Sequence, residues 1–381
     1  MTHPETRVIH SVVPSLPDCR PLSPPIYQTS AFAFDDPEAF AFSLGSPEGF
    51  AYSRRANPTT RALEDTLAAL EGGVAAFATA SGMGAINAVL LSLLRPGDHV
   101  VAQRCLYGGT FAVFTDLAAR FGIEVTYFSD TPVFQDNTKV LYVETIANPM
   151  TGVSDLPALA AAAKCAGVTV VVDNSFASPL LCQPLRHGAD IVIHSTTKYL
   201  AGHSDVIGGA AVFASADLFR STWTYAGELG AAADPFGSWL TLRGMQTLAL
   251  RMERHCSNAE YVATRLLTHP AVSAVHWPGL AGHPDHAIAK RLLSGYGGVL
   301  AFDLASRAAG RAFTSKVRLA ALAASLGGVE TLVLHPASTS HQALDAAALR
   351  AAGIGEGTVR MAVGLEHPED IWADVEQALD D

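Results

Sequence analysis

The segments VVVDNSF (residues 170–176) and IVIHSTTKYL (residues 191–200) indicate the fold class of this 381-residue chain. Each begins with an unbroken apolar run, which is typical of a strand buried on both faces of a parallel sheet. Asp173 follows the first run, and Ser195, Thr197 and Lys198 follow the second. Because functional groups at the carboxyl ends of parallel strands face the ligand crevice, we expect these four side chains to meet at one edge of the sheet.

The same alternation of short apolar runs and helical patterns surrounds these segments. Helical patterns cover 59–73, 81–94 and 154–167, the last with Ser154 as N-cap and Gly167 beyond its end. This alternation predicts an α/β domain with a mostly parallel sheet flanked by helices on both faces. The further strand-like runs lie at 74–81, 99–103, 124–128, 139–145 and 209–214.

The chain is longer than the ~250–300 residues that one core usually serves, so we expect more than one domain. Residues 1–50 are rich in Pro, Ser and Phe without a sustained period, and predict an irregular arm that contacts a neighbouring subunit. A large domain is predicted over 51–248. A long helix over 248–267 and later strands and helices predict a smaller α+β domain over 249–381.

Composition narrows the class of protein. The chain is 49% hydrophobic and carries a net charge of −11, so nucleic acid and anionic membranes are poor partners. Residues 72–94 carry no charge, but their four glycines and polar residues favour a strand, a turn and a helix over a membrane span. Five widely spaced cysteines without a CxxC motif favour free thiols in a reducing cytoplasm. The pair His283 and His286 is interpreted as a loop, so no metal site is predicted.

The pair of Lys198 and Asp173 predicts a pyridoxal phosphate (PLP) site. A lysine leaving an apolar strand can have a lowered pKa and form a Schiff base. A carboxylate on the next strand can keep the pyridine nitrogen protonated, and the hydroxyls of Ser195 and Thr197 can bind a phosphate. The turn 81–83 (SGM) between a strand and a helix is a further candidate anion site. Lys198 or Asp173 alone is better explained as an ordinary strand-end or turn residue, and the turn 81–83 alone fits a tight helix-packing turn equally well. The combination favours PLP.

Nine ordered motifs extend this prediction over nearly the whole chain. With them the sequence resembles the Cys/Met-metabolism family of PLP-dependent enzymes, which includes cystathionine γ-synthase, cystathionine γ-lyase, methionine γ-lyase and O-acetylhomoserine sulfhydrylase. The resemblance implies the PLP-dependent transferase fold type I. The motifs are YSRRANPT (52–59), SGM (81–83), YGGT (107–110), ETIANP (144–149), VDNSFAS (172–178), HSTTKYLAGHSD (194–205), RMERH (251–255), SLG (325–327) and VRMAVGL (359–365).

The resemblance implies three catalytic residues. Lys198 resembles the lysine that binds PLP and carries protons, and Asp173 resembles the partner of the ring nitrogen. Tyr107 resembles the tyrosine that stacks on the pyridine ring and protonates the leaving group.

The resemblance also implies binding residues. Tyr52 and Arg54 match residues that reach the phosphate of the neighbouring subunit, so a homodimer or homotetramer with shared active sites is implied. The cofactor-binding residues implied are Tyr52, Arg54, Ser81, Gly82, Met83, Tyr107, Asp173, Ser195, Thr197 and Lys198, and those implied for the substrate α-carboxylate are Asn148, Ser325 and Arg360.

Three positions bear on the substrate. Cystathionine enzymes of the family carry a Glu where this chain has Ala324, and the lyases carry an Arg where it has Ala112. Both departures favour γ-elimination on methionine or homocysteine, giving 2-oxobutanoate, ammonia and a thiol. Gly109 argues the other way, because methionine γ-lyases often have Cys there. Sulfhydrylase and cystathionine chemistry remain alternatives, and an inactive PLP-binding paralogue is disfavoured because Lys198 and its partner groups are all present.

Overall fold

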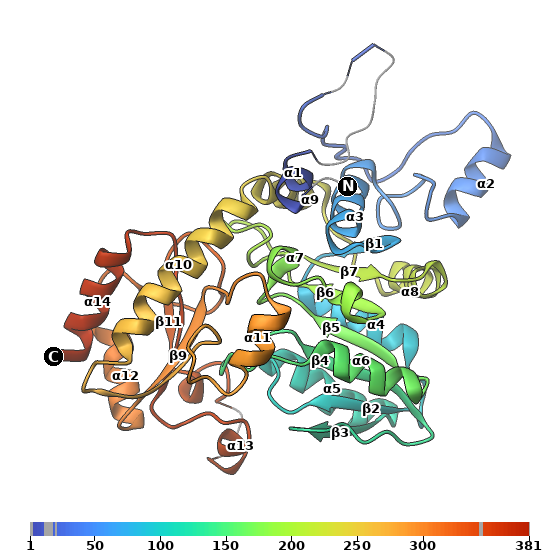
Figure 1. Ribbon diagram of the computed structural model, residues 1–381. Helices are drawn as coiled ribbons and strands as arrows, with labels where there is room; N and C mark the ends of the chain where they lie inside the picture. The colour runs from blue at the N-terminus through green and yellow to red at the C-terminus, as the bar shows by residue number, and fades with distance from the viewer. Residues whose placement is uncertain (1–2, 11–17, 20, 343–345, 381) are drawn as a thin grey trace.

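A seven-stranded sheet forms the centre of the computed structural model, which describes residues 3–10, 18–19, 21–342 and 346–380 (Figure 1). The order is β1-β7-β6-β5-β4-β2-β3, and β3, β2, β4, β5 and β6 are parallel. The mostly parallel sheet predicted from the sequence is therefore confirmed. The strands are β1 (Ala75–Thr79), β2 (His99–Gln103), β3 (Glu124–Phe128), β4 (Thr138–Glu144), β5 (Thr169–Asp173), β6 (Ile191–His194) and β7 (Gly209–Phe213).

Strand β7 departs from the parallel arrangement. It runs antiparallel to both of its neighbours, β6 and β1. A parallel neighbour would need a crossover connection, usually a helix, and the segment 195–208 between β6 and β7 contains none. The chain therefore turns back beside β6, and the returning loop keeps residues 195–198 at the carboxyl edge of the sheet.

Helices cover both faces of this sheet, as predicted. α4, α5 and α8 pack on one face through residues such as Ile86, Phe114 and Trp223, and α3 and α6 pack on the other. Gly167 lies past the end of α6 with φ +67°, as expected, but the predicted N-cap is wrong: Asp155 is the cap, and Ser154 Oγ instead donates to Glu144 O at 2.7 Å. The helices are α3 (Pro58–Glu71), α4 (Gly82–Leu93), α5 (Gly108–Phe121), α6 (Leu156–Cys165), α7 (Ser178–Leu181), η1 (Pro184–His187), α8 (Ala216–Leu229) and α9 (Pro235–Met245).

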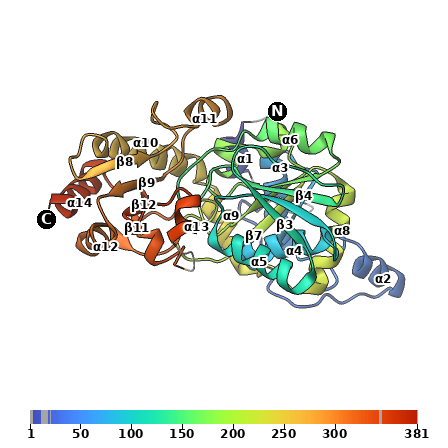
Figure 2. The ribbon, with the colours of Figure 1, turned by 90° about the horizontal axis from the view of Figure 1, so that it is seen from below.

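A second sheet of five strands lies beside the first (Figure 2). Its order is β10-β11-β12-β9-β8, and α10, α12 and α14 pack against it. The predicted boundary at 248/249 falls where α10 begins, but core residues from both sides of it share one cluster, so the division into domains stays a prediction. The elements are α10 (Leu248–Leu266), β8 (Val272–His276), α11 (His286–Leu292), β9 (Val299–Leu304), α12 (Arg307–Lys316), β10 (Ala321–Leu322), β11 (Leu332–Leu334), η2 (Pro336–Ser338), α13 (Ala346–Ala351), β12 (Thr358–Ala362) and α14 (Pro368–Asp380).

The predicted arm is less irregular than expected, and residues 1–2, 11–17 and 20 of it lie outside the described residues. It contains α1 (Pro4–Ile9), which packs on α3, and α2 (Pro37–Gly45), which stands away from the body of the chain (Figure 1). Phe40, Phe42 and Leu44 of α2 are exposed apolar residues. Contact of this arm with another subunit stays a prediction.

The charge-free stretch 72–94 folds as β1, a turn and α4, as predicted. Within the described part of the chain, no helix combines the length and apolarity needed to cross a membrane. All five cysteines are free. His286 is the first residue of α11 rather than part of a loop, and no group of metal-ligating side chains occurs among the described residues.

Candidate active site

A cavity of about 450 Å³ opens at the carboxyl ends of β4, β5 and β6. One wall comes from the large sheet and its helices, and the other comes from residues 324–326 and from β11 and β12 of the second sheet. The cavity brings together most of the residues predicted from the sequence. They are Ser81, Gly82, Met83, Tyr107, Asn148, Asp173, Ser195, Thr197, Lys198, Ser325 and Arg360.

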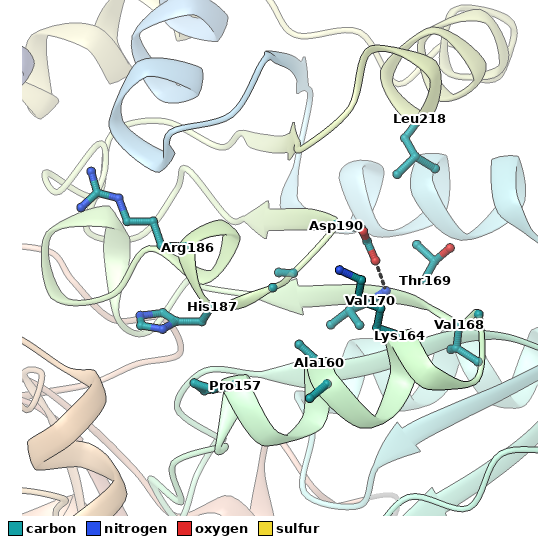
Figure 3. Close-up of a pocket in the computed structure, with 14 residues that line it drawn as sticks. Pro157, Ala160, Lys164, Val168, Thr169, Val170, Arg186, His187, Asp190 and Leu218 are labelled. Atoms are coloured by element: carbon teal, nitrogen blue, oxygen red, sulfur yellow. Dashed lines mark hydrogen bonds between the residues drawn. The ribbon is translucent and has the colours of Figure 1, made fainter.

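A larger hollow of about 690 Å³ lies near the opposite ends of β5 and β6, between α6 and η1 (Figure 3). Lys164, Arg186 and His187 line it, and Asp190 accepts the N–H of Val170 at 2.8 Å. Lys164 and Arg186 are exposed to solvent. None of the predicted site residues reaches this hollow, so size alone does not identify the active site.

Lys198 lies in the turn that follows β6. Its Nζ donates to Ser325 Oγ at 2.7 Å, which joins the large sheet to the opposite wall of the cavity. Burial lowers the pKa of Lys198 to about 8, with a smaller contribution from Arg360, while Asp173 opposes the shift. With this pKa about a tenth of the Lys198 amines are neutral, and thus nucleophilic, at pH 7.

Asp173 shares its end of the sheet with a second carboxylate, that of Glu144. The two residues are in-register partners on β5 and β4, so their side chains lie on the same face. Burial raises the pKa of Asp173, and hydrogen bonds from Ser175 oppose that shift. Burial and the neighbouring Asp173 also raise the pKa of Glu144. A pair of carboxylates in this position favours a positively charged ligand group such as a pyridinium.

The phosphate end of the cavity is formed where α4 begins. Ser81 caps this helix by accepting the N–H of Gly84 at 3.0 Å. A Cβ at Gly82 would lie 2.9 Å from the Cβ of Ser195, so only glycine allows the helix start and the turn after β6 to approach this closely. Thr197 Oγ1 accepts the N–H of Gly208 at 3.0 Å, which fixes the hydroxyl at the edge of the cavity.

Arg360 of β12 lies at the opposite end of the cavity and is 5% exposed. Its Nη1 donates to Asn148 Oδ1 at 3.1 Å, and its Nη2 donates to Ser325 O at 2.6 Å. Its Nε has no partner among the described residues. A buried guanidinium with an unpaired N–H is suited to bind a carboxylate. Ser325 has a φ of +101°, a strained conformation for a residue other than glycine, which is common at functional sites.

Tyr107 precedes α5, lines the cavity and is 45% exposed. A Cβ at Gly109 would lie 2.6 Å from Cε1 of the Tyr107 ring and 3.0 Å from Met83 Sδ. Because Gly109 has no side chain, the Tyr107 ring can occupy this space.

Three residues named from the sequence lie outside this cavity. Tyr52 and Arg54 do not line it: the Arg54 guanidinium donates to Gly227 O and lies 5.7 Å from the Tyr52 ring. Their predicted contact with a neighbouring subunit stays a prediction. Ala112 is exposed on α5 and does not line the cavity either, whereas Ala324 does.

Sequence reasoning missed two groups that support the site. Glu144 could have been found, because it ends an apolar strand as Asp173 does. The second group is a buried network in which Glu71 Oε1 accepts from Asn174 Nδ2 at 2.9 Å and lies 2.6 Å from His194 Nε2. Thr145 Oγ1 donates to Asn174 Oδ1 at 2.7 Å. This network joins the ends of β4, β5 and β6 behind the cavity, and it depends on a long-range contact with α3 that no local pattern reveals.

These residues fit PLP. The carboxylate pair suits a protonated ring nitrogen, Lys198 supplies a partly neutral amine, and the crowded Gly82 and Ser195 backbone forms a cradle that a Cβ would fill. The unpaired Nε of Arg360 remains for the carboxylate of an amino acid.

The lowered pKa of Lys198 predicts how PLP uptake depends on pH. At pH 8 about half of the Lys198 amines are neutral, compared with about 0.3% for a lysine with the ordinary pKa of 10.5. The rate of covalent PLP uptake by apoprotein should therefore rise about tenfold per pH unit below pH 8 and level off above it. Stopped-flow absorbance between about pH 6 and pH 10 measures this rate. A rate that keeps rising to pH 10 would show that Lys198 titrates as an ordinary lysine.

Comparison with known proteins gives a consistent result. The family model for Cys/Met metabolism PLP-dependent enzymes matches residues 5–380. The chain is 45% identical over 370 residues to an L-methionine gamma-lyase of Fusobacterium nucleatum, covering 94% of this chain and 93% of the relative. It is 41% identical to a cystathionine gamma-lyase of Bacillus subtilis, covering 99% of each chain. A solved structure from Campylobacter jejuni, assigned as an O-acetylhomoserine (thiol)-lyase and carrying a pyridoxyl-lysine, superimposes with a TM-score of 0.95 at 33% identity and covers 100% of both chains. The family, the fold type I architecture and the PLP cofactor predicted from the sequence are confirmed.

Proposed function

This chain belongs to the Cys/Met metabolism family of PLP-dependent enzymes. We propose that it catalyses γ-elimination on methionine or homocysteine, releasing 2-oxobutanoate, ammonia and a thiol. The chain is a PLP-dependent enzyme, and its relatives include carbon–sulfur lyases. What we propose in addition is a preference for methionine or homocysteine over the other sulfur amino acids.

The residues of the cavity divide the chemistry among them. PLP, when bound, supplies an electron sink for negative charge that develops at the substrate Cα. Arg360 and Asn148 bind the α-carboxylate, which orients the Cα–H bond towards Lys198. The neutral amine of Lys198 takes the Cα proton, and Asp173 keeps a proton on the ring nitrogen. A second proton then leaves Cβ, and its electron pair forms the Cβ–Cγ double bond as the bond from Cγ to sulfur breaks. The Tyr107 hydroxyl gives a proton to the departing sulfur, and water completes the release of ammonia.

One observation carries the substrate proposal. The charged residues that line the cavity are Glu144, Asp173, Lys198 and Arg360. In this proposal Asp173 and Lys198 act at the cofactor and Arg360 binds the α-carboxylate, while Glu144 accepts the backbone N–H groups of Tyr107 and Asn148. Burying the distal ammonium and carboxylate of cystathionine without partners would cost several kcal/mol per ion. An S-methyl group instead gains from burial at ~0.8 kcal/mol per carbon. Eight of the remaining lining residues are apolar, namely Met83, Ile86, Ile146, Phe176, Ile207, Ala324, Leu326 and Leu334.

A second candidate substrate is cystathionine, and a different observation favours it. A groove of about 640 Å³ adjoins the cavity and shares Ala324 and Ser325 with it. Asp205 and Glu330 line this groove and are exposed. Two carboxylates there could attract a distal ammonium, although solvent weakens such contacts.

The experiment that tests the proposal compares substrates. Purified enzyme is incubated with methionine, homocysteine, cystathionine or O-acetylhomoserine, and 2-oxobutanoate and new thioethers are assayed. We expect the highest kcat/KM with methionine or homocysteine. The proposal is falsified if cystathionine gives the highest value. Loss of that value in the D205N/E330Q double variant would then assign the preference to the groove.

Ala324 gives a sharper prediction within the same assay. A324E places a carboxylate at the junction of the cavity and the groove. It should raise kcat/KM for cystathionine relative to methionine by about tenfold or more, because a site that pairs a substrate's polar group discriminates strongly. A324Q is the matched control, since it has nearly the same size without the charge. An equal change in A324Q would show that size alone is responsible. Adding A112R to A324E tests the second position, at which this chain has Ala112 where the lyases of the family carry an Arg.

The assembly and location are part of this proposal. We propose a homodimer or homotetramer in which Tyr52 and Arg54 complete the phosphate site of a neighbouring subunit. The position of both residues outside their own cavity supports this assembly. The five free cysteines support a reducing compartment, and we propose the cytoplasm.

A further inference from the structure

Glu144 lines the cavity together with Lys198 and Arg360. Its carboxylate forms hydrogen bonds with other groups. It is the last residue of β4, it is 4% exposed, and it lines the cavity beside its register partner Asp173. Its own backbone is held on both sides. Its N–H donates to Gln103 Oε1 at 3.1 Å, and its carbonyl accepts from Ser154 Oγ. The side chain therefore projects from a fixed backbone.

The two carboxylate oxygens of Glu144 bind two different segments. Oε1 accepts the backbone N–H of Tyr107 at 2.7 Å, and Oε2 accepts the backbone N–H of Asn148 at 3.1 Å. Tyr107 belongs to the turn between β2 and α5, and Asn148 belongs to the turn after β4. One buried carboxylate thus joins the turn that carries the tyrosine to the turn that carries the amide bonded to Arg360.

We propose that Glu144 is a positioning residue, whose two oxygens hold Tyr107 and Asn148 in their working places beside Asp173. The proposal rests on the proposed function for the roles of Tyr107 and Asn148. Two acceptor oxygens are required because both partners are N–H donors. Glutamine offers one acceptor and one donor, so one of the two backbone N–H groups would face an NH₂ group instead of an oxygen. The turn whose N–H loses its acceptor would then shift. The Tyr107 ring or the Asn148–Arg360 pair would shift with that turn.

The test uses E144Q in the complete, PLP-loaded enzyme. L-Norleucine has the α-amino and α-carboxylate groups of methionine but no sulfur to eliminate, and its binding can be followed through the visible absorbance of bound PLP. We expect the norleucine dissociation constant to rise and kcat to fall, each by about tenfold to a hundredfold, the range for a small misplacement of substrate-binding groups. PLP content should stay at the level of the unmodified enzyme.

Glu64 supplies the matched control. It is also buried, and its carboxylate accepts the backbone N–H of Ala78 at 2.9 Å, but it lies on α3 and does not line the cavity. E64Q should leave norleucine affinity and kcat unchanged even if it lowers the melting temperature. If E144Q does not accumulate as folded protein, E144D takes its place, because the shorter side chain keeps the charge but cannot span both N–H groups.

The outcomes separate this proposal from the proposed function. Norleucine affinity and kcat within about twofold of the unmodified enzyme would overturn the positioning role. Loss of PLP from E144Q but not from E64Q would overturn it as well, by assigning Glu144 to cofactor retention. A preference for cystathionine over methionine would contradict the proposed function and leave the norleucine result unaffected.

Discussion

Replacing Lys198 by alanine is expected to abolish both the visible absorbance of covalently held PLP and the formation of 2-oxobutanoate. Lys198 faces the carboxylate pair and Ser325 from the end of β6, and its partly neutral amine is the one lysine nitrogen that lines the described cavity. Loss of proton transfer alone lowers a rate by about 10²–10⁴-fold, and loss of the covalent anchor adds to this effect. Absorbance spectra and a single-turnover assay of 2-oxobutanoate measure the two losses separately.

Lys164 provides the control for this experiment. It is an exposed lysine that lines the larger hollow near the other ends of β5 and β6 (Figure 3). K164A should keep both the absorbance and the activity. A K198A protein that retains activity within about tenfold of the unmodified enzyme would remove Lys198 from the mechanism.

Mixing two inactive proteins, R54A and K198A, is expected to restore activity. If Arg54 serves the neighbouring subunit, a mixed dimer has one site that lacks both groups and one intact site. Random exchange of equal amounts then gives about a quarter of the unmodified activity, because about half of the dimers are mixed and each has one working site. The structure supports this arrangement, since Arg54 does not line the cavity that holds Lys198 of its own chain.

A mixture of D173A and K198A is the matched negative control. Asp173 and Lys198 line the same cavity of one chain, so every site of a mixed dimer would lack one of them. No activity should return. If the R54A and K198A mixture also stays inactive, with mixed dimers demonstrated by mass spectrometry of tagged subunits, the shared site is contradicted.

Site residues could be predicted where the local sequence indicates the end of a strand and sheet geometry brings such ends together. Asp173 and Lys198 end apolar runs, and parallel strands place such ends together, so their meeting could be expected from the residues alone. The same rule would have found Glu144. Arg360 and Asn148 are different, because a buried arginine is recognisable only from the tertiary contacts that surround it. Both residues were predicted only from the family resemblance.

Other features depend on contacts that no single segment contains. The direction of β7 follows from the absence of a crossover helix after β6, which the run GAAVFA does not reveal by itself. The Glu71–His194 contact joins residues 123 positions apart, and its partners are ordinary in sequence. Ser154 satisfies the usual preference for an N-cap and yet bonds to the strand instead, because tertiary structure offered it another acceptor.

The buried network of Glu71, Asn174 and His194 bears on how the substrate specificity of such an enzyme can evolve. It holds the strand ends that carry the site from behind the cavity, in a buried position that no substrate reaches. Part of the opposite wall comes from a separate segment, residues 324–326. Ser325 of this segment bonds to Lys198 and Arg360, whereas Ala324 lines the cavity without such a bond. Substitutions of Ala324 in this wall can therefore redirect the enzyme to another amino acid while the proton-transfer machinery stays intact. Directed evolution of new sulfur-amino-acid specificities would best begin with libraries at this wall.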